Sequence, residues 1–367
     1  MKKKIAIISL LVLMAGFGFG VNRYIAAQKR DPAAPPTNPT QEVPAFSLPG
    51  TIYVAQQGQL YSFRAGHFGQ IAEPTKDFDG EPIDWQDPVP LPNGTLIVVK
   101  RGFEYSDFYN IDQTGKVLSQ MTQNYRGNDP NTIRSDHWVY WPILAPDGVT
   151  LYYSVDSPKD GYTYEVDFNV WSTVITGGPI TVQNSTPNGV IRGTRWTIPN
   201  YYTGGDTDPM PLRAGGLLYV EYAIGGDGKV FAQLGLVASP LGRTKALTTP
   251  DQNCNAAVLS PDQTHVAMIC TADHQTTQLE VATFDGTTLG TPSVLVSGCL
   301  CASPQWSPDG QSLIYLAPPA PPNDALGHFQ LWWLDKAAAL THAAPKQVTA
   351  TLDLDATSVP AWTARTS

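Results

Sequence analysis

A tight-turn hairpin recurs along this chain, and it constrains the fold more than any other feature. The copies are DPVPLPNGTLIVV from Asp87, WPILAPDGVTLYY from Trp141, DPMPLRAGGLLYV from Asp208, NAAVLSPDQTHVAM from Asn255 and SPQWSPDGQSLIY from Ser303. In a typical copy an apolar or proline-rich segment leads into a turn whose Pro presets φ and whose Asp-Gly or Asn-Gly accepts a positive φ. A segment rich in β-branched and aromatic residues follows. Each copy is therefore predicted to be a β-hairpin.

The spacing of the hairpins predicts a β-propeller. The aligned positions are Pro88, Pro142, Pro209, Ala257 and Pro304, at intervals of 54, 67, 48 and 47 residues. Repeats of this length that contain only strands are typical of propeller blades. Two further strand-like segments follow each hairpin, such as QLEVATFD at 278–285 and PSVLVS at 292–297. Each unit is therefore predicted to be a blade of four strands.

The two ends of the repeat region predict how the ring closes. Residues 50–73 supply three strands without a preceding hairpin, and SVPAWT at 358–363 repeats the start of the last hairpin and then stops. We expect this segment to pair with the N-terminal strands, which leaves no free sheet edge at the seam. The predicted fold is all-β: a six-bladed propeller closed by its C-terminal strand and preceded by a hydrophobic helix.

The last hairpin also carries a family resemblance. The phrase P-x-W-S-P-D-G at 304–310, followed by Leu313, Ile314 and Tyr315, resembles the repeat of TolB-like six-bladed propellers, which the propeller domains of dipeptidyl and prolyl peptidases share. The resemblance extends over roughly residues 50–365, with one intact copy. TolB has an α/β domain before its propeller, whereas here a hydrophobic segment and a linker precede it. The resemblance therefore implies the fold and no specific role in a Tol system.

The N-terminal region is predicted to direct export. Three lysines at positions 2–4 precede the uncharged stretch Ile5 to Val21, which has the length of a long signal-peptide core or of a short membrane span. We interpret residues 1–30 as a signal peptide or a membrane anchor, and we favour the anchor. Residues 31–49 are rich in proline and are interpreted as an extended linker, and residues 50–367 as the propeller. The propeller is then membrane-anchored and extracytoplasmic, or secreted or periplasmic after cleavage.

Charge and cysteine content limit the partners and the compartment. Six of the 23 Lys and Arg residues lie in the first thirty positions, which hold no acidic residue, so the remainder carries 17 basic against 32 acidic residues. This negative field argues against a nucleic-acid partner. The four cysteines, Cys254, Cys270, Cys299 and Cys301, are disulfide candidates in an oxidising compartment. If Leu259 faces His265 across the hairpin, the same register places Cys254 opposite Cys270, close enough for a disulfide. The alternative is that the cysteines are buried free thiols. A zinc site fits their spacing poorly.

Long loops are predicted to gather on one face of the propeller. The connections between first and second strands, and between third and fourth strands, are predicted to be tight, whereas segments 101–107, 154–167, 317–329, 122–140 and 184–208 are long. The last two flank the third blade and are rich in the side chains that most often anchor interfaces. The candidate binding residues are Tyr125, Arg126, Arg134, His137, Trp138, Arg195, Trp196, Tyr201 and Tyr202. The alternative is that Trp138 and Trp196 fold back as plugs and that the arginines pair with nearby aspartates.

Catalysis is the alternative function. The sequence contains no G-x-S-x-G elbow, and its turns lack the S-x-D-x-G-x-x-W box of sialidases. A metal-dependent hydrolase would need Asp, Glu, Asn or His side chains that converge on the channel, and the candidates are His137, Asp136, Asp206 and Asp208. The alternative is that these are ordinary solvated side chains of polar loops. We therefore predict a non-enzymatic, monomeric binding or scaffold module without a cofactor or metal. It recognises a protein or peptide through the long-loop face, and a secreted carbohydrate-active or metal-dependent hydrolase using the same face is the alternative.

Overall fold

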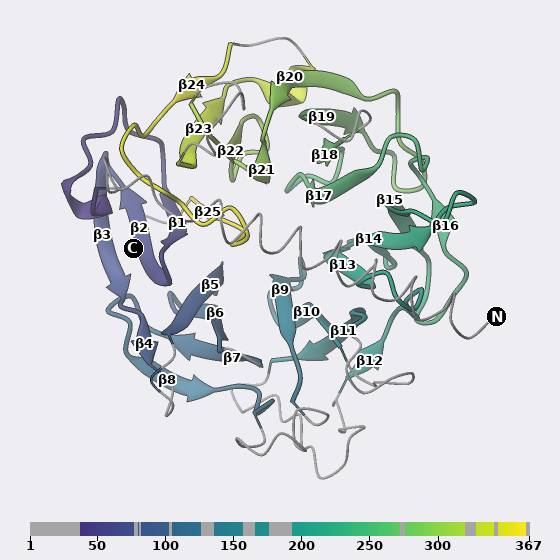
Figure 1. Ribbon diagram of the computed structural model, residues 1–367, viewed down its shortest axis with the longest axis horizontal. Coiled ribbons are helices and arrows are strands. Elements are labelled where there is room, and N and C mark those ends of the chain that lie inside the picture. The colour runs from purple at the N-terminus through teal and green to yellow at the C-terminus, as the bar shows by residue number, and fades with distance from the viewer. Residues whose placement is uncertain are drawn as a thin grey trace, which may run out of the picture.

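The computed structural model describes residues 37–76, 80, 82–102, 105–125, 136–156, 166–175, 193–271, 276–319, 328–340 and 344–364. Within these ranges the chain forms six antiparallel sheets arranged as blades around a central axis (Figure 1). The helical elements of the described residues are two 3-10 turns, η1 (Pro39–Gln41) and η2 (Ala337–Ala339). The predicted six-bladed all-β propeller with four-stranded blades is therefore confirmed. The predicted N-terminal helix lies outside the described residues.

The first three blades contain the N-terminal half of the chain. Blade 1 has the order β25 (Ala361–Thr363), β1 (Thr51–Gln56), β2 (Gln59–Arg64) and β3 (His67–Ala72). Blade 2 has the order β4 (Thr75–Lys76), β5 (Pro82–Pro90), β6 (Leu96–Arg101), β7 (Ser106–Ile111) and β8 (Val117–Gln120). Blade 3 consists of β9 (Val139–Leu144), β10 (Thr150–Val155), β11 (Asn169–Val174) and β12 (Thr194–Arg195). The short β4 makes the sheet of blade 2 five-stranded, which the sequence pattern did not predict.

The other three blades are regular sheets of four consecutive strands. Blade 4 consists of β13 (Asp206–Pro211), β14 (Leu217–Ile224), β15 (Val230–Val237) and β16 (Lys245–Ala246). Blade 5 consists of β17 (Cys254–Leu259), β18 (His265–Cys270), β19 (Thr277–Thr283) and β20 (Ser293–Cys299). Blade 6 consists of β21 (Ala302–Trp306), β22 (Leu313–Ala317), β23 (Gln330–Leu334) and β24 (Lys346–Gln347).

The same β-bulge occurs in the first strand of five blades. The bulge occurs in β5, β9, β13, β17 and β21. In each of them two residues lie opposite a single residue of the following strand. The two residues inside each bulge are the aligned hairpin position and its predecessor, as in Asp87-Pro88 and Ser303-Pro304. Proline suits this place because a bulge interrupts the ladder, so the missing N–H costs no sheet hydrogen bond. The repeated proline therefore marks a repeated bulge.

The hydrophobic core lies between neighbouring blades. Each of the six pairs of adjacent blades shares one cluster of buried apolar side chains. Trp306 of β21 is 1% exposed and joins two blades, because its indole N–H donates to the carbonyl of Val258 in β17 at 3.1 Å. The P-x-W-S-P-D-G phrase therefore supplies a core residue as well as a turn.

Segments from both ends of the described chain meet at blade 1. β25 pairs antiparallel with β1, with Thr363 opposite Thr51 and Ala361 opposite Tyr53. Residues 37–49, which the sequence analysis assigned to a linker, pack against the propeller at this seam. The buried Glu42 carboxylate accepts hydrogen bonds from the N–H groups of Ala350 and Thr351 at 2.7 and 3.3 Å. At least the second half of that segment is therefore part of the folded body.

The hairpin of β17 and β18 contains one of two disulfides. Cys254 pairs with Cys270 in register and is bonded to it, which confirms the bridge favoured from the sequence. The predicted pairing of Leu259 with His265 is wrong: Leu259 faces Val266, because the bulge in β17 shifts the register by one residue. The second disulfide joins Cys299 to Cys301. In the described part of the chain no helix is long and apolar enough to span a membrane.

One predicted loop assignment is wrong. We treated residues 184–208 as a blade-to-blade segment, but β12 (Thr194–Arg195) pairs with β11 and is the fourth strand of blade 3. The long connection before β12 therefore joins a third strand to a fourth, on the face where we expected only tight turns. The segment that joins blades 3 and 4 is shorter and runs from Trp196 to Gly205. A two-residue strand followed by Trp gave too weak a pattern to be recognised.

Candidate functional site in the central channel

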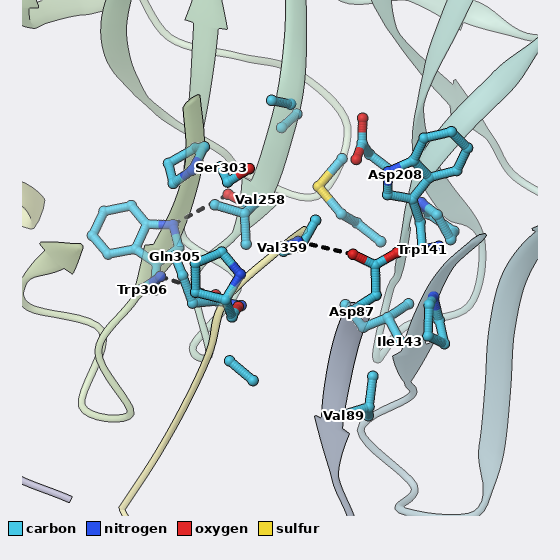
Figure 2. A pocket seen from close by; sticks show the side chains of 18 of the residues that line it. Asp87, Val89, Trp141, Ile143, Asp208, Val258, Ser303, Gln305, Trp306 and Val359 are labelled. Atoms are coloured by element: carbon cyan, nitrogen blue, oxygen red, sulfur yellow. Dashed lines mark hydrogen bonds between the residues drawn. The ribbon is translucent and has the colours of Figure 1, made fainter. Parts of the chain in front are cut away.

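A cavity of about 570 Å³ occupies the channel that the first strands of the blades surround. Its lining comes from β5, β9, β13, β17 and β21 and from the segment 356–362 around β25. Figure 2 shows this cavity, with Asp87, Trp141 and Asp208 labelled near one another and Ser303 and Gln305 on the other side. Several of the aligned prolines line it as well, which makes much of the wall apolar and rigid. A cavity of this size suits a small molecule or one or two side chains of a partner.

The bulges give the channel a repeated set of side chains. The first residue of each bulge has a positive φ between 44° and 51°; these residues are Asp87, Trp141, Asp208, Ala256 and Ser303. All of them line the cavity. Residues other than glycine seldom adopt this left-handed conformation, and when they do the site often has a function. The bulge thus fixes which side chain of each blade faces the channel.

Asp87 connects three segments across the channel. Its carboxylate accepts hydrogen bonds from the N–H of Val359 at 2.8 Å and from the N–H of Trp141 at 3.3 Å. Its own N–H donates to the Ser358 hydroxyl at 3.0 Å. Burial raises the pKa of this carboxyl to about 7, although the two N–H groups act in the opposite direction. Asp87 therefore orders blade 2 against blade 3 and against the chain that leads into β25.

Asp208 occupies the equivalent bulge of blade 4 with fewer partners. The Thr207 hydroxyl donates to its carboxylate at 3.0 Å. Burial raises the pKa of Asp208 to about 7, and the hydrogen bond from Thr207 lowers it only in part. Burial, and next the Asp208 charge, raise the pKa of Tyr222 to about 12. The channel therefore presents two carboxyl groups that titrate near neutral pH.

The side of the channel formed by blade 6 is neutral and tied to the C-terminal segment. The Ser303 hydroxyl donates to the carbonyl of Ala356 at 2.9 Å, and the Gln305 side-chain amide donates to the carbonyl of Pro360 at 3.1 Å. These bonds and those of Asp87 hold residues 356–360 from two sides. One side of the channel thus carries the carboxyl groups of Asp87 and Asp208, and the other side is neutral. A ligand with a positive charge would therefore bind with that charge toward Asp87 and Asp208.

Further carboxylates lie close to the channel lining. Asp355 accepts a hydrogen bond from the side-chain amide of Gln86 at 3.1 Å, next to Asp87 in the sequence. Burial, and next the Asp355 charge, raise the pKa of Asp84, whereas Arg101 lowers it. Acidic groups thus outnumber basic ones around this part of the channel.

Two of the predicted binding residues, Tyr201 and Tyr202, lie on a preorganised loop. They are 41% and 57% exposed and belong to the segment between β12 and β13. The Asp167 carboxylate accepts hydrogen bonds from three consecutive N–H groups of this loop, those of Tyr202, Thr203 and Gly204, at 2.9, 3.1 and 2.9 Å. The loop is therefore held in one shape, with both tyrosines accessible to a partner.

Two other predicted binding residues, His137 and Trp196, are buried. Trp196 is 8% exposed, packs against Tyr152 and donates its indole N–H to the Ser172 hydroxyl at 2.9 Å. The His137 side chain has no exposed surface, and its Nδ1 lies 3.1 Å from Oδ1 of the equally buried Asp156. These side chains support the blades from inside and do not present a surface for a partner.

Three of the five remaining predicted residues are partly buried, and two lie outside the described residues. Trp138 stacks on Tyr140 with 6.0 Å between ring centroids, and Tyr125 packs against Tyr105 at 4.8 Å. Arg195 donates its Nε–H to the carbonyl of Thr197 at 2.9 Å. Arg126 and Arg134 lie outside the described residues. In the portion of the chain that the structure describes, no three His, Cys, Asp or Glu side chains converge as a metal site would require.

The sequence analysis missed the channel carboxylates as a group. We named Asp208 as a channel candidate but did not compare the residue before each aligned position, which is Asp in two blades and Trp, Ala and Ser in the other three. The dipeptides D-P, W-P, D-P and S-P at equal positions of blades 2, 3, 4 and 6 were the available signal. It predicts a ring of inward-facing side chains once the bulge is known.

Comparisons with known proteins support this architecture. No protein-family model and no curated protein sequence matches the chain. Among solved structures, the crystal structure of TolB from Acinetobacter baumannii is similar, with a TM-score of 0.57 and 16% identity over 85% of this chain and 66% of that one. The chain has a TolB-like propeller fold. The resemblance inferred from the P-x-W-S-P-D-G phrase is thereby confirmed.

Two more structures agree with this fold assignment. A putative TolB from Agrobacterium tumefaciens has a TM-score of 0.51 and 13% identity over 85% of this chain and 92% of that chain. A protein of unknown function from Bacteroides caccae has a TM-score of 0.52 and 9% identity over 85% and 98% of the two chains. At such identities the likeness concerns the TolB-like fold and carries no activity or partner.

Proposed function

We propose that this protein is a non-enzymatic binding or scaffold module that recognises a protein or peptide through the face carrying Tyr201 and Tyr202. The observation that carries the proposal is the loop fixed by Asp167, which keeps two large aromatic side chains exposed without a cost in loop ordering. Tyrosine is enriched at interface hot spots because it offers a large apolar surface and a polar tip. Ile198, which belongs to the same segment, is 61% exposed.

The proposal includes the setting of the module. An N-terminal signal peptide or anchor places the propeller outside the cytoplasm, tethered to a membrane, and the propeller acts as a monomer. Ring closure by the C-terminal strand is part of the same proposal. It is supported by the pairing of β25 with β1 and by the hydrogen bonds from Asp87 to Ser358 and Val359.

The test is capture of partners from a cell-envelope extract by the tagged full-length chain. Tyr201→Ala together with Tyr202→Ala should abolish the capture of proteins that the wild type retains. Val149→Ala is the matched control, because Val149 is 49% exposed but belongs to the turn between β9 and β10 at the opposite face. Equal capture by the tyrosine variant and the control would reject this surface.

The channel provides a reason to test the hydrolase alternative. Asp87 and Asp208 both border the cavity, and a carboxyl group with a pKa near 7 is suited to general acid or base catalysis. Turnover on a panel of glycoside, ester and phosphoester substrates, lost in Asp208→Asn, would favour the enzyme. Absence of turnover together with tyrosine-dependent capture would favour the binding module.

A further inference from the structure

The two disulfides differ in position and in accessibility. Cys254 and Cys270 are 1% and 2% exposed and close a loop with a sequence separation of 16 inside the hairpin of blade 5. Cys299 and Cys301 have a sequence separation of 2 and bridge the connection from β20 to β21, the step from blade 5 to blade 6. The first bridge lies within a sheet, and the second lies in a connection between two sheets.

The sulfurs of the second bridge are unequally exposed. Cys301 is 5% exposed and belongs to the apolar cluster between blades 5 and 6, whereas Cys299 packs against the edge of the same cluster and is partly exposed. The neighbouring Gly298 is exposed, and the space next to its Cα is open to at least 4 Å. Thiol–disulfide exchange requires a thiolate to reach one sulfur while the other departs. The geometry therefore makes Cys299 the sulfur that is attacked and Cys301 the one that leaves.

The backbone around this bridge is held by hydrogen bonds that do not involve the S–S bond. The N–H of Cys301 donates to Thr277 Oγ1 at 2.7 Å, and that hydroxyl donates to the carbonyl of Cys299 at 3.0 Å. β20 also pairs with β19 through Cys299 and Thr277. A bridge that closes so short a loop restricts the unfolded chain very little. Reduction should therefore leave the two thiols adjacent within a folded propeller, ready to re-form the bond.

We propose that Cys299–Cys301 is a reversible thiol–disulfide exchange site that accepts two electrons from an external dithiol, such as a dithiol oxidoreductase. A thiolate of the dithiol attacks Cys299 Sγ, and the S–S electron pair leaves on Cys301 Sγ, which takes up a proton. The second thiol then attacks the mixed disulfide and releases Cys299 as a thiol. The dithiol becomes a disulfide as the bridge becomes two thiols. This inference does not depend on the proposed binding function.

The experiment uses the folded, oxidised full-length protein, and the Cys254–Cys270 bridge is its internal control. Dithiothreitol is added in native buffer, samples are quenched with N-ethylmaleimide over time, and peptide mass spectrometry measures the reduction of each bridge. We expect Cys299–Cys301 to be reduced at least about tenfold faster, because burial protects the other bridge until the blade opens. The circular dichroism spectrum should stay native, and removal of dithiothreitol should restore the bond.

Two single variants test the direction of attack. Cys301→Ser leaves Cys299 as a thiol, and Cys299→Ser leaves Cys301. We expect the thiol of the first variant to react with 5,5′-dithiobis(2-nitrobenzoate) about tenfold faster than that of the second, since access controls exchange. Equal rates for the two bridges, loss of the native spectrum on reduction of Cys299–Cys301, or equal reactivity of the two thiols would each overturn the proposal.

Discussion

Replacement of Asp208 by asparagine should stabilise the propeller at pH 8, and should stabilise it by a clearly smaller amount at pH 5. The pKa of Asp208 is raised to about 7 by burial, so the folded protein holds a proton that the unfolded chain, with a carboxyl pKa of about 3.9, has already released. Between these two values the folded state binds more protons. The free energy of unfolding therefore falls as pH rises from about 4 to about 7.

The magnitude follows from the size of the shift. About three pKa units correspond to roughly 4 kcal/mol at 1.36 kcal/mol per unit. Because Asp208 borders an open cavity, where water reduces the penalty, we expect about 2 to 4 kcal/mol at pH 8, of which about a third is already lost at pH 5. Asparagine keeps the shape and the oxygen that accepts from Thr207, so the variant should recover most of this free energy at pH 8. Asp87→Asn is the control, because its carboxylate accepts from two backbone N–H groups and an amide offers only one oxygen.

Urea unfolding at pH 5 and pH 8, followed by tryptophan fluorescence, measures both effects. The wild type should lose stability between the two values, Asp208→Asn should lose less, and Asp87→Asn should gain nothing at pH 8. If the wild type and Asp208→Asn show the same difference between pH 5 and pH 8, the carboxylate is hydrated and charged in the channel. The reasoning about its burial would then be refuted.

Three further changes test the packing. The double change Cys254→Ala and Cys270→Ala should lower the free energy of unfolding by about 3 kcal/mol, which is the chain-entropy value for a loop of this length. A thermal unfolding midpoint equal to that of the wild type would contradict this account. Glu42→Ala should cost about 1 to 3 kcal/mol, because the N–H groups of Ala350 and Thr351 lose a charged acceptor. If urea titration gives the same midpoint as the wild type, residues 37–49 do not contribute to the fold. Trp306→Ala should cost about 3 to 5 kcal/mol through the cavity it leaves, and a loss below 1 kcal/mol in calorimetry would mean that blades 5 and 6 collapse around the gap.

The fold could be read from the sequence because its strongest signals are local. The Pro and Asp-Gly turns specify hairpins, and their spacing specifies blades. The same locality explains the errors. The pairing of Leu259 with His265 assumed an unbroken ladder, and only the three-dimensional bulge shows the one-residue shift. β12 pairs through two residues, too few to create a periodic pattern.

The site was harder to predict because exposure depends on which neighbour covers a side chain. Trp196 and Tyr201 belong to the same aromatic-rich segment, yet one is 8% and the other 41% exposed. Ser172, in another strand of the blade, accepts the hydrogen bond that holds the tryptophan inside. Asp87 and Asp208 appear in the sequence as ordinary turn-like residues. Both line the channel because the blades surround a common axis, which cannot be read from either hairpin alone.

The repeated bulge separates the chemistry of the channel from the architecture that surrounds it. The first residue of each bulge lines the channel, so its identity sets the chemistry of the lumen, although Asp87 also ties blade 2 to blade 3. The positive φ favours Asn, Asp and Gly, which accept that conformation most readily, although Trp141, Ala256 and Ser303 adopt it as well. A small combinatorial library at these five positions would therefore convert the acidic lumen into a neutral or amide-lined one, and the propeller would serve as a scaffold for engineered receptors.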